Sequence, residues 1–259
     1  MKRNRLLLCS TALALLASCG KDDHKEAKSA APPPAPPSYF KVDPATAGAV
    51  TGRIRFTGKK PEQAVIDMDQ DADCAKMHPH GRVMSGTTVV NKNGTLANVF
   101  VYVKAGLEGK KFEPPSKPAT MDQNGCWFEP RVLGIETGQT LNVTNSDPVT
   151  HNIHPVAHVN REWNHSQAPG DPPIVRRFVK PEIMIPVKCN IHHWMHAYIG
   201  VVDNPYFAVT GTDGAFELRN LPPGNYTLAA WHEQLGEQEM PITIKPSGTA
   251  EAAFTFQGK

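Results

Sequence analysis

Many short runs with a strand-like pattern, separated by turn-forming residues, constrain the fold of this 259-residue chain more than any other feature. Runs with two-residue alternation or β-branched residues lie at 50–56, 97–103, 139–144, 182–187 and 198–202. Turn-forming sequences separate them at 93–94, 145–148 and 168–173. Because no convincing amphipathic helix interrupts this pattern, it predicts an all-β protein made of sandwiches.

The C-terminal part has a more regular strand pattern, with strands predicted at 206–210, 215–219 and 226–231 and two more up to Phe256. The stretch 212–228 reads Thr-Asp-Gly-Ala-Phe-Glu-Leu-Arg-Asn-Leu-Pro-Pro-Gly-Asn-Tyr-Thr-Leu. It resembles the carboxypeptidase regulatory-like, transthyretin-like module. The resemblance implies a small structural β-sandwich at 205–259 without catalytic residues of its own.

Residues 1–19 are typical of a bacterial export signal. A basic start precedes an apolar stretch at 6–17 that is too short to span a bilayer as a helix. The segment ends in Leu-Ala-Ser-Cys19, which resembles the lipobox of bacterial lipoproteins and implies cleavage before Cys19 and acylation of that residue. Gly20 resembles the sorting pattern of the outer membrane, so we expect a lipid anchor in the cell envelope, with the outer membrane facing the periplasm favoured over the inner one. An ordinary secretory signal with an incidental cysteine is the alternative.

The signal is followed by a predicted linker, and the mature chain has a nearly balanced charge. Residues 20–42 are charged at first and then rich in Ala and Pro, which is typical of a semi-extended linker. Removing Lys2, Arg3 and Arg5 with the signal from the 27 basic residues leaves 24, against 25 acidic ones. This balance gives no support for nucleic-acid binding, and no basic run supports membrane binding by charge alone.

A short segment near residue 190 carries metal-ligand chemistry. The sequence Cys189-Asn-Ile-His192-His-Trp-Met195 places a thiol, an imidazole and a thioether within seven residues, at a predicted turn between two strands. With one distant imidazole, these are the donors of a type 1 copper site, in which two His and one Cys form a plane and Met is a weak axial ligand. The distant imidazole is supplied by Asn145-Ser-Asp-Pro-Val-Thr-His151-Asn152.

These two segments together resemble the cupredoxin family, the amicyanin and pseudoazurin type most closely. The family pattern has a turn, then His-Asn, then a long stretch of chain and finally Cys-x-x-His followed by Met. Here the first His precedes the Cys by 38 positions, and the spacings Cys to His and His to Met are three each. The resemblance covers 97–203 and implies a Greek-key cupredoxin-like sandwich at 43–204 that binds one copper ion. The positions that match the ligands are His151, Cys189, His192 and Met195, and Asn152 matches a residue that braces the ligand loop.

The sequence departs from the family pattern in this loop. Ile191 stands where small cupredoxins commonly carry Pro, and His193 and His196 crowd the same turn and could compete as ligands. His154 follows His151 by three positions along a strand, so it should point away from the metal, but it is the alternative ligand. The opposite hypothesis is a buried free thiol at Cys189 among surface histidines.

The remaining cysteines divide between a disulfide and the metal site. Export implies an oxidising compartment, and three cysteines remain once those of the signal and the lipid anchor are set aside. With Cys189 a ligand in the resemblance, Cys74 and Cys126 are the natural disulfide partners. The alternative is a second soft-metal site in the segment from Cys74 to His80, which also contains Met77 and His78.

The expected function is one-electron transfer. A site that tolerates both copper states suits a protein that carries electrons between redox proteins. Because protein ligands hold every coordination position, we expect neither enzymatic activity nor a small-molecule substrate. The solvent-facing edge of His192, ringed by Ile191, Trp194 and Met195, is the expected electron exit. Copper capture or delivery by the His- and Met-rich surface is the alternative, and a structural cell-envelope lipoprotein with a decayed site is the third hypothesis.

Overall fold

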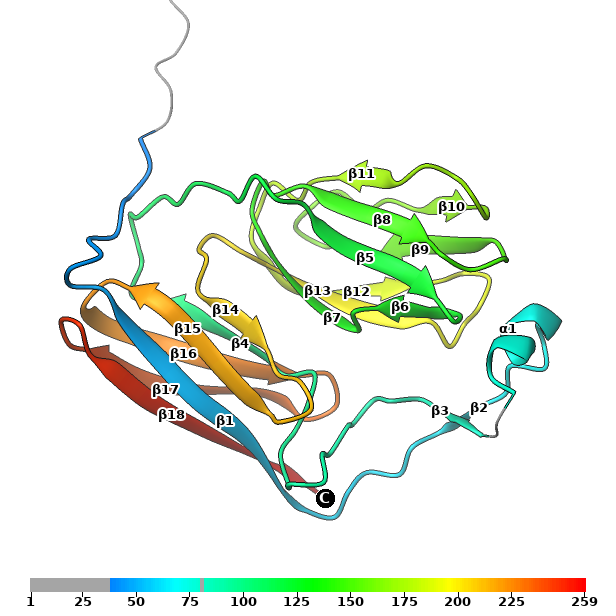
Figure 1. Ribbon diagram of the computed structural model, residues 1–259, viewed down its shortest axis with the longest axis horizontal. Helices are drawn as coiled ribbons and strands as arrows, with labels where there is room; N and C mark the ends of the chain where they lie inside the picture. The colour runs from blue at the N-terminus through cyan, green and yellow to red at the C-terminus, as the bar shows by residue number, and fades with distance from the viewer. Residues whose placement is uncertain (1–37, 80–81) are drawn as a thin grey trace, which may run out of the picture. The chain divides into compact units, whose positions relative to one another are not determined.

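The computed structural model describes residues 38–79 and 82–259. The predicted signal at 1–19, Cys19, most of the linker and His80 lie outside the described residues. Residues from Ser38 to Lys259 form one compact unit. No helix within the described ranges is long and apolar enough to cross a bilayer. The regular secondary structure of the described chain is almost wholly β-strand, which confirms the predicted all-β class (Figure 1).

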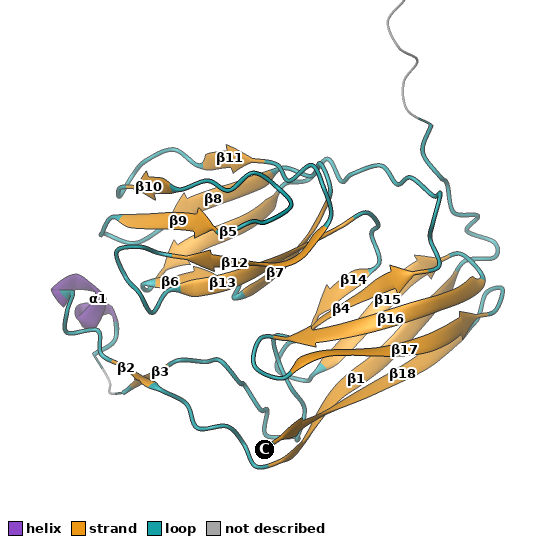
Figure 2. Cartoon of the chain, turned by 180° about the vertical axis from the view of Figure 1, so that it is seen from behind, coloured by secondary structure: helices purple, strands orange, loops and turns teal. Residues whose placement is uncertain are grey.

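The first sandwich consists of two sheets that enclose one apolar core (Figure 2). The five-stranded sheet has the order β10-β9-β12-β13-β7, and the four-stranded sheet has the order β11-β8-β5-β6. The strands are β5 (Ala119–Asn124), β6 (Trp127–Glu129), β7 (Val132–Glu136), β8 (Leu141–Asn145), β9 (His151–Pro155), β10 (His165–Gln167), β11 (Ile174–Arg176), β12 (Glu182–Lys188) and β13 (His196–Val202). Their inward-facing side chains include Met121, Leu141, Ile153, Ile185 and Ile199, all buried.

The second sandwich combines strands from both ends of the described chain. One sheet has the order β14-β4-β16-β17 and the other the order β15-β1-β18. The strands are β1 (Gly48–Gly58), β4 (Phe100–Ala105), β14 (Phe207–Val209), β15 (Ala215–Leu221), β16 (Gly224–His232), β17 (Gly236–Ile244) and β18 (Thr249–Gly258). Val50, Leu218, Leu228 and Phe254 are among the buried residues that form its core.

The strand pairing crosses the domain boundary that the sequence predicted between residues 204 and 205. Strand β1 pairs in parallel with β18 from Ala49 to Gly58, and β4 pairs antiparallel with β16. The two sandwiches are therefore not divided at a single point of the chain. The alternation of apolar residues reveals that a strand exists and which face is buried, but it does not identify the partner strand.

The segment between β1 and β4 contains the helix that the sequence analysis did not predict. It holds the short strands β2 (Val65–Ile66) and β3 (Val83–Met84) and the helix α1 (Ala72–Met77). Asp71 caps the helix, because its Oδ1 atom accepts from the backbone N atoms of Asp73 and Cys74 at 3.0 Å each. The Cys74–Cys126 disulfide then ties α1 to the turn between β5 and β6.

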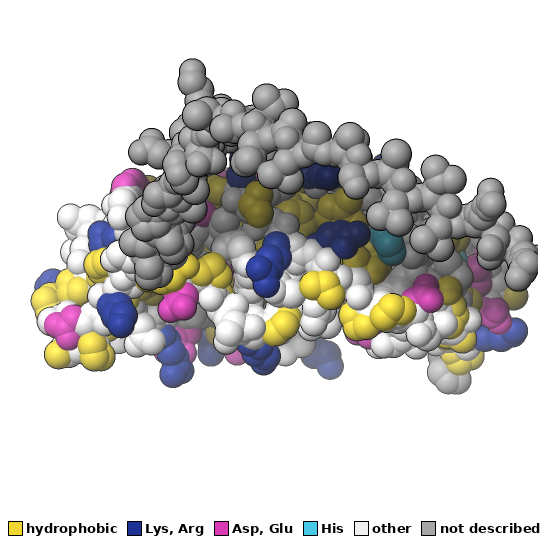
Figure 3. Space-filling view, turned by 90° about the horizontal axis from the view of Figure 1, so that it is seen from above, with side chains coloured by type: hydrophobic (Ala, Val, Ile, Leu, Met, Phe, Trp, Pro, Cys, Tyr) yellow, Lys and Arg dark blue, Asp and Glu magenta, His cyan; other side chains and the backbone are white. Residues whose placement is uncertain are grey.

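The surface carries charges of both signs. Figure 3 shows basic, acidic and apolar side chains scattered over one face of the molecule. This mixture is what a chain with 27 basic and 25 acidic residues is expected to present.

Candidate metal centre

The ligand residues predicted from the sequence lie at the ends of neighbouring strands of the five-stranded sheet. β9 begins at His151, and β12 ends at Lys188, directly before Cys189. The two strands are antiparallel and pair Lys188 with His154. The start of β9 and the turn after β12 therefore meet at one end of the first sandwich, which places segments 38 residues apart in the sequence next to each other.

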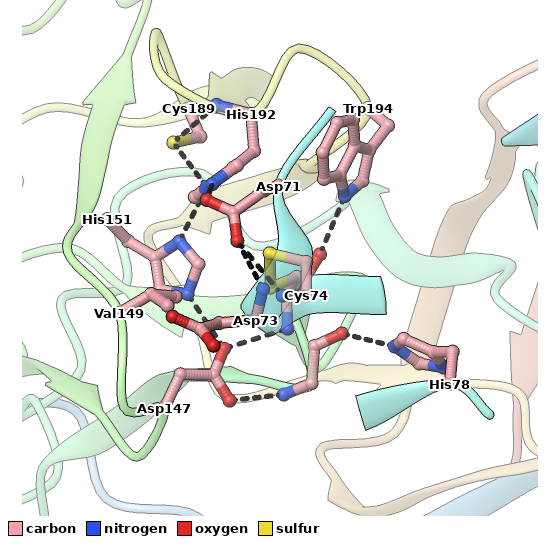
Figure 4. Close-up of a disulfide and its surroundings, with 12 residues drawn as sticks. Asp71, Asp73, Cys74, His78, Asp147, Val149, His151, Cys189, His192 and Trp194 are labelled. Carbon is pink, nitrogen blue, oxygen red and sulfur yellow. Dashed lines mark hydrogen bonds and ion pairs between the residues drawn. A yellow bond between two sulfur atoms is a disulfide. The ribbon is translucent and has the colours of Figure 1, made fainter. Parts of the chain in front are cut away.

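Three donor side chains converge at this end. The Nδ1 atoms of His151 and His192 are 2.9 Å apart, and the Sγ atom of Cys189 lies 3.9 Å from Nδ1 of His192 (Figure 4). One ligand atom from each residue lies within 4.8 Å of the other two. All three residues are buried, with exposed fractions of 0, 2 and 2% for His151, Cys189 and His192. The structure thus brings together three of the four predicted ligands.

Met195, the fourth predicted ligand, is fully buried in the same turn. Its backbone N donates to the carbonyl of His192 at 2.9 Å, and its carbonyl accepts from the backbone N of Cys189 at 3.1 Å. These two bonds close the loop between the thiol and β13. The loop conformation is therefore fixed by the backbone, and the side chain of Met195 packs in the core cluster that also contains Cys189.

A buried carboxylate holds the other ring nitrogen of His151. The Nε2 atom donates to Oδ2 of Asp147 at 2.7 Å, and the same carboxylate accepts from the backbone N atoms of Gly125 at 2.6 Å and Cys126 at 2.7 Å. Burial raises the pKa of Asp147, but these hydrogen bonds outweigh it and hold the pKa below its usual value. A charged Asp147 keeps a proton on Nε2, so Nδ1 is the ring nitrogen of His151 that a metal could bind.

A second carboxylate holds His192 in the same way. The Nε2 atom of His192 lies 3.1 Å from Oδ2 of Asp71, whose other oxygen caps α1. The hydrogen bond from the Cys74 backbone, followed by that from His192, lowers the pKa of Asp71. Each imidazole therefore has a carboxylate on Nε2 and presents Nδ1 to the thiol, as the sticks in Figure 4 show.

The thiol itself is suited to bind a cation. Burial raises the pKa of Cys189, but hydrogen bonds from His151, His192 and the backbone of His192 and Asn152 lower it to about 5. These hydrogen bonds favour the thiolate form of Cys189. A bound cation would replace the protons that these groups share, so that two imidazole nitrogens and one thiolate would act as donors. Copper prefers such a set, and no carboxylate oxygen is among the three converging donors. The residues present therefore fit a bound copper ion.

The other predicted residues of this loop make contacts outside the three-donor cluster. Oδ1 of Asn152 accepts from the backbone N of Asn190 at 2.5 Å, which joins β9 to the ligand loop. Nε2 of His154 contacts Glu162 at 2.5 Å. Nε2 of His196 accepts from Arg131 at 2.7 Å, and His193 is exposed.

The cysteines pair as predicted. Cys74 and Cys126 form a disulfide with a Cα–Cα distance of 5.7 Å, and Cys189 is the free cysteine among the described residues. His78, which the alternative assigned to a second metal site with Cys74, instead contacts the carbonyl of Gly125 through Nε2 at 2.6 Å.

The prediction of a solvent-facing His192 edge is wrong. His192 is 2% exposed, and of the residues expected to ring it, Trp194 and Met195 are buried while Ile191 is 52% exposed. The cause is the segment that carries α1, which brings Asp71 onto Nε2 of His192 from 121 positions earlier in the chain. Strand patterns alone could not place this segment over the ligand loop.

Sequence reasoning also missed both carboxylates that contact the imidazoles. Asp71 precedes Ala-Asp-Cys-Ala-Lys-Met, and an Asp at that place is a signal for a helix N-cap. Asp147 lies in the predicted turn 145–148, where Asp is common for local reasons. Neither the helix-cap signal nor the turn signal indicates that these carboxylates contact His192 and His151 in the folded protein.

Comparisons with known proteins find solved structures of low sequence identity and low structural similarity. No protein-family model matches the sequence, and no curated protein matches it. A Cu-containing nitrite reductase from Thermus scotoductus SA-01 is 23% identical over 39% of this chain and 25% of that chain, with a TM-score of 0.32. An oxidized point mutant of amicyanin is 17% identical over 39% of this chain and 97% of that one, with a TM-score of 0.30. A purple cupredoxin from Nitrosopumilus maritimus is 22% identical over 32% of this chain and 98% of that one, with a TM-score of 0.28. Since identities and scores are this low, the ligand assignment depends on this chain's own residues.

Proposed function

We propose that this protein holds one copper ion between His151, Cys189 and His192, with Met195 as a weak axial ligand, and transfers single electrons between redox proteins. The observation that carries the proposal is the convergence of the three buried donors within 4.8 Å. Copper bound there supplies a one-electron couple, because thiolate sulfur favours Cu(I) and imidazole suits both oxidation states.

The surrounding residues support electron transfer over substrate chemistry. Asp147 and Asp71 fix the proton of each imidazole on Nε2, so neither ring needs to turn or change tautomer when the metal changes charge. The burial of all three donors excludes water and leaves little room for a substrate. A rigid, closed set of donors favours a change of charge without a change of ligands.

The cellular setting of this proposal comes from the sequence. The signal at 1–19 and Cys19 favour a lipid anchor in the cell envelope, and the linker at 20–42 allows the folded unit to reach partners near a membrane. The partners are redox proteins, and the second sandwich has a structural role.

Copper stoichiometry and redox cycling test the proposal. The mature chain without its lipid is dialysed against excess Cu(II), washed, and assayed for bound copper, then cycled electrochemically. We expect one tightly bound copper per chain and a reversible one-electron wave that persists over many cycles. Several weakly held copper ions, with no reversible wave, would instead indicate copper capture by surface histidines and would refute electron transfer. His193→Ala is the matched control, because this exposed histidine lies in the ligand loop.

A further inference from the structure

We propose that Asp71 is a positioning residue for His192, and that helix α1, tethered by the Cys74–Cys126 disulfide, closes the His192 edge of the metal centre. The inference rests on the proposed function, because it assigns His192 a metal to hold. It also concerns a contact that can be measured without any metal.

The side chain of Asp71 serves two partners at once. Oδ1 accepts from the backbone N atoms of Asp73 and Cys74, and Oδ2 lies 3.1 Å from Nε2 of His192. The first pair of bonds fixes the carboxylate at the start of α1. With its carboxylate fixed, Asp71 holds the imidazole of His192 at an orientation that presents Nδ1 to Cys189.

The disulfide and one backbone hydrogen bond connect the two imidazole–carboxylate pairs. Cys74, on α1, is bonded to Cys126, and the backbone N of Cys126 donates to Asp147 at 2.7 Å. A continuous path therefore runs from the Asp71–His192 pair through the disulfide to the Asp147–His151 pair, as Figure 4 shows. A six-residue helix is too short to be stable by itself, so α1 depends on this tether to stay in place.

The same elements exclude solvent from His192. Asp71 covers Nε2 on one side, and the indole of Trp194 lies on another, with its ring centroid 5.2 Å from that of His192. Nε1 of Trp194 donates to the carbonyl of Cys126 at 3.1 Å, which holds the indole against the same turn. His192 is 2% exposed as a result, and a chelator gains access to its edge when α1 moves away.

Substitutions can separate the role of Asp71 as a helix cap from its contact with His192. In Asp71→Asn the amide oxygen can still cap α1, but the amide cannot supply a carboxylate to Nε2. In Asp71→Ser the hydroxyl can cap the helix but is too short to reach His192. The matched control is Asp73→Asn, since Asp73 lies on the same helix and its carboxylate pairs with the exposed Lys76.

The first test uses the metal-free full-length mature chain and follows the Nε2 proton of His192 by NMR. We expect a slowly exchanging proton in the wild type and in Asp73→Asn, and fast exchange or loss of its signal in Asp71→Asn and Asp71→Ser. If both Asp71 variants keep the slow proton, the positioning role is refuted. Because no copper is present, this result stands whether or not the chain proves to be a copper protein.

The second test measures copper removal from the Cu(I)-loaded chain by a Cu(I) chelator. We expect about 10- to 100-fold weaker copper retention in Asp71→Asn than in Asp73→Asn, the range typical of residues that orient a metal ligand. The double variant Cys74→Ser with Cys126→Ser should also release copper faster, since α1 has lost its tether. Release rates equal to those of the wild type in both would overturn the closure. If the chain binds no copper while the NMR contact is present, the proposed function fails and the Asp71–His192 contact survives.

Discussion

The Nε2 atom of His151 lies 2.7 Å from a carboxylate oxygen of Asp147, and both residues are buried. The carboxylate also accepts two backbone N–H bonds from the turn that contains Cys126. Asp147 thereby ties strand β9, which begins at His151, to the turn that carries the disulfide. Asp147 therefore stabilises this region of the fold and orients the imidazole of His151.

Asp147→Ala should destabilise the metal-free protein by about 3 kcal/mol, because three donors, two of them buried, lose their acceptor. Asp147→Asn should cost less, since the amide oxygen can still accept one or two of the bonds. Chemical denaturation measures both free energies of unfolding. Asp171→Ala is the control, because its carboxylate accepts from Ala168 on an exposed turn. A loss no larger than that of the control would mean that Asp147 does not organise this region.

Removal of the disulfide should also lower stability. The Cys74–Cys126 bond closes a loop with a sequence separation of 52, and its loss should cost about 4 kcal/mol according to the chain-entropy model. The double serine variant and the reduced wild-type protein should give similar free energies of unfolding. If the double variant is as stable as the oxidised wild type, the tether of α1 has no energetic role.

Glu136 should make stability depend on pH. Burial raises the pKa of its carboxyl group to about 7, and Lys110, Lys111 and Asp203 line the cavity beside it. Between the pKa of the unfolded chain and that of the folded chain, the folded state holds a proton that the unfolded state has lost. The stability that this group contributes is therefore fully present below about pH 4.5 and decreases as the pH rises to about 7, by up to roughly 3 kcal/mol.

Glu136→Gln should remove this part of the pH dependence. The free energy of unfolding, measured at pH 5 and pH 8, should fall less between the two values in the variant than in the wild type. Glu251→Gln, at an exposed position of β18, should behave as the wild type does. Equal pH dependence in all three proteins would contradict a raised pKa at Glu136.

Trp194 should report metal binding. Its ring centroid lies 5.2 Å from that of His192, so Cu(II) at the three donors should quench its fluorescence. We expect Trp194→Phe to lose most of the quenching caused by one equivalent of Cu(II). Trp231→Phe, in β16 of the second sandwich, should keep it. Equal quenching in both variants would place the metal elsewhere.

The sequence was sufficient for the fold class and for the three donor residues that converge in the structure. Strand alternation located β12 and β13, and the spacing of His151, Cys189 and His192 anticipated side chains that meet in space. These features are local or depend on neighbouring strands, which is why patterns reveal them.

The helix that covers the candidate metal centre could not be predicted in the same way. Helix α1 has six residues, too few for a clear apolar period, and Asp71 meets His192 across 121 positions. The pairing of β1 with β18 spans almost the whole described chain. Such long-range contacts depend on the topology of the chain, which the pattern of apolar residues along the sequence does not specify.

The most direct test of the metal centre is the visible and EPR spectrum of the mature chain with one equivalent of Cu(II), recorded beside Cys189→Ala. We expect an intense thiolate-to-copper band with narrow parallel hyperfine splitting, lost in Cys189→Ala and retained in His193→Ala. A colourless protein with an ordinary nitrogen–oxygen copper signal, unchanged in Cys189→Ala, would contradict this expectation.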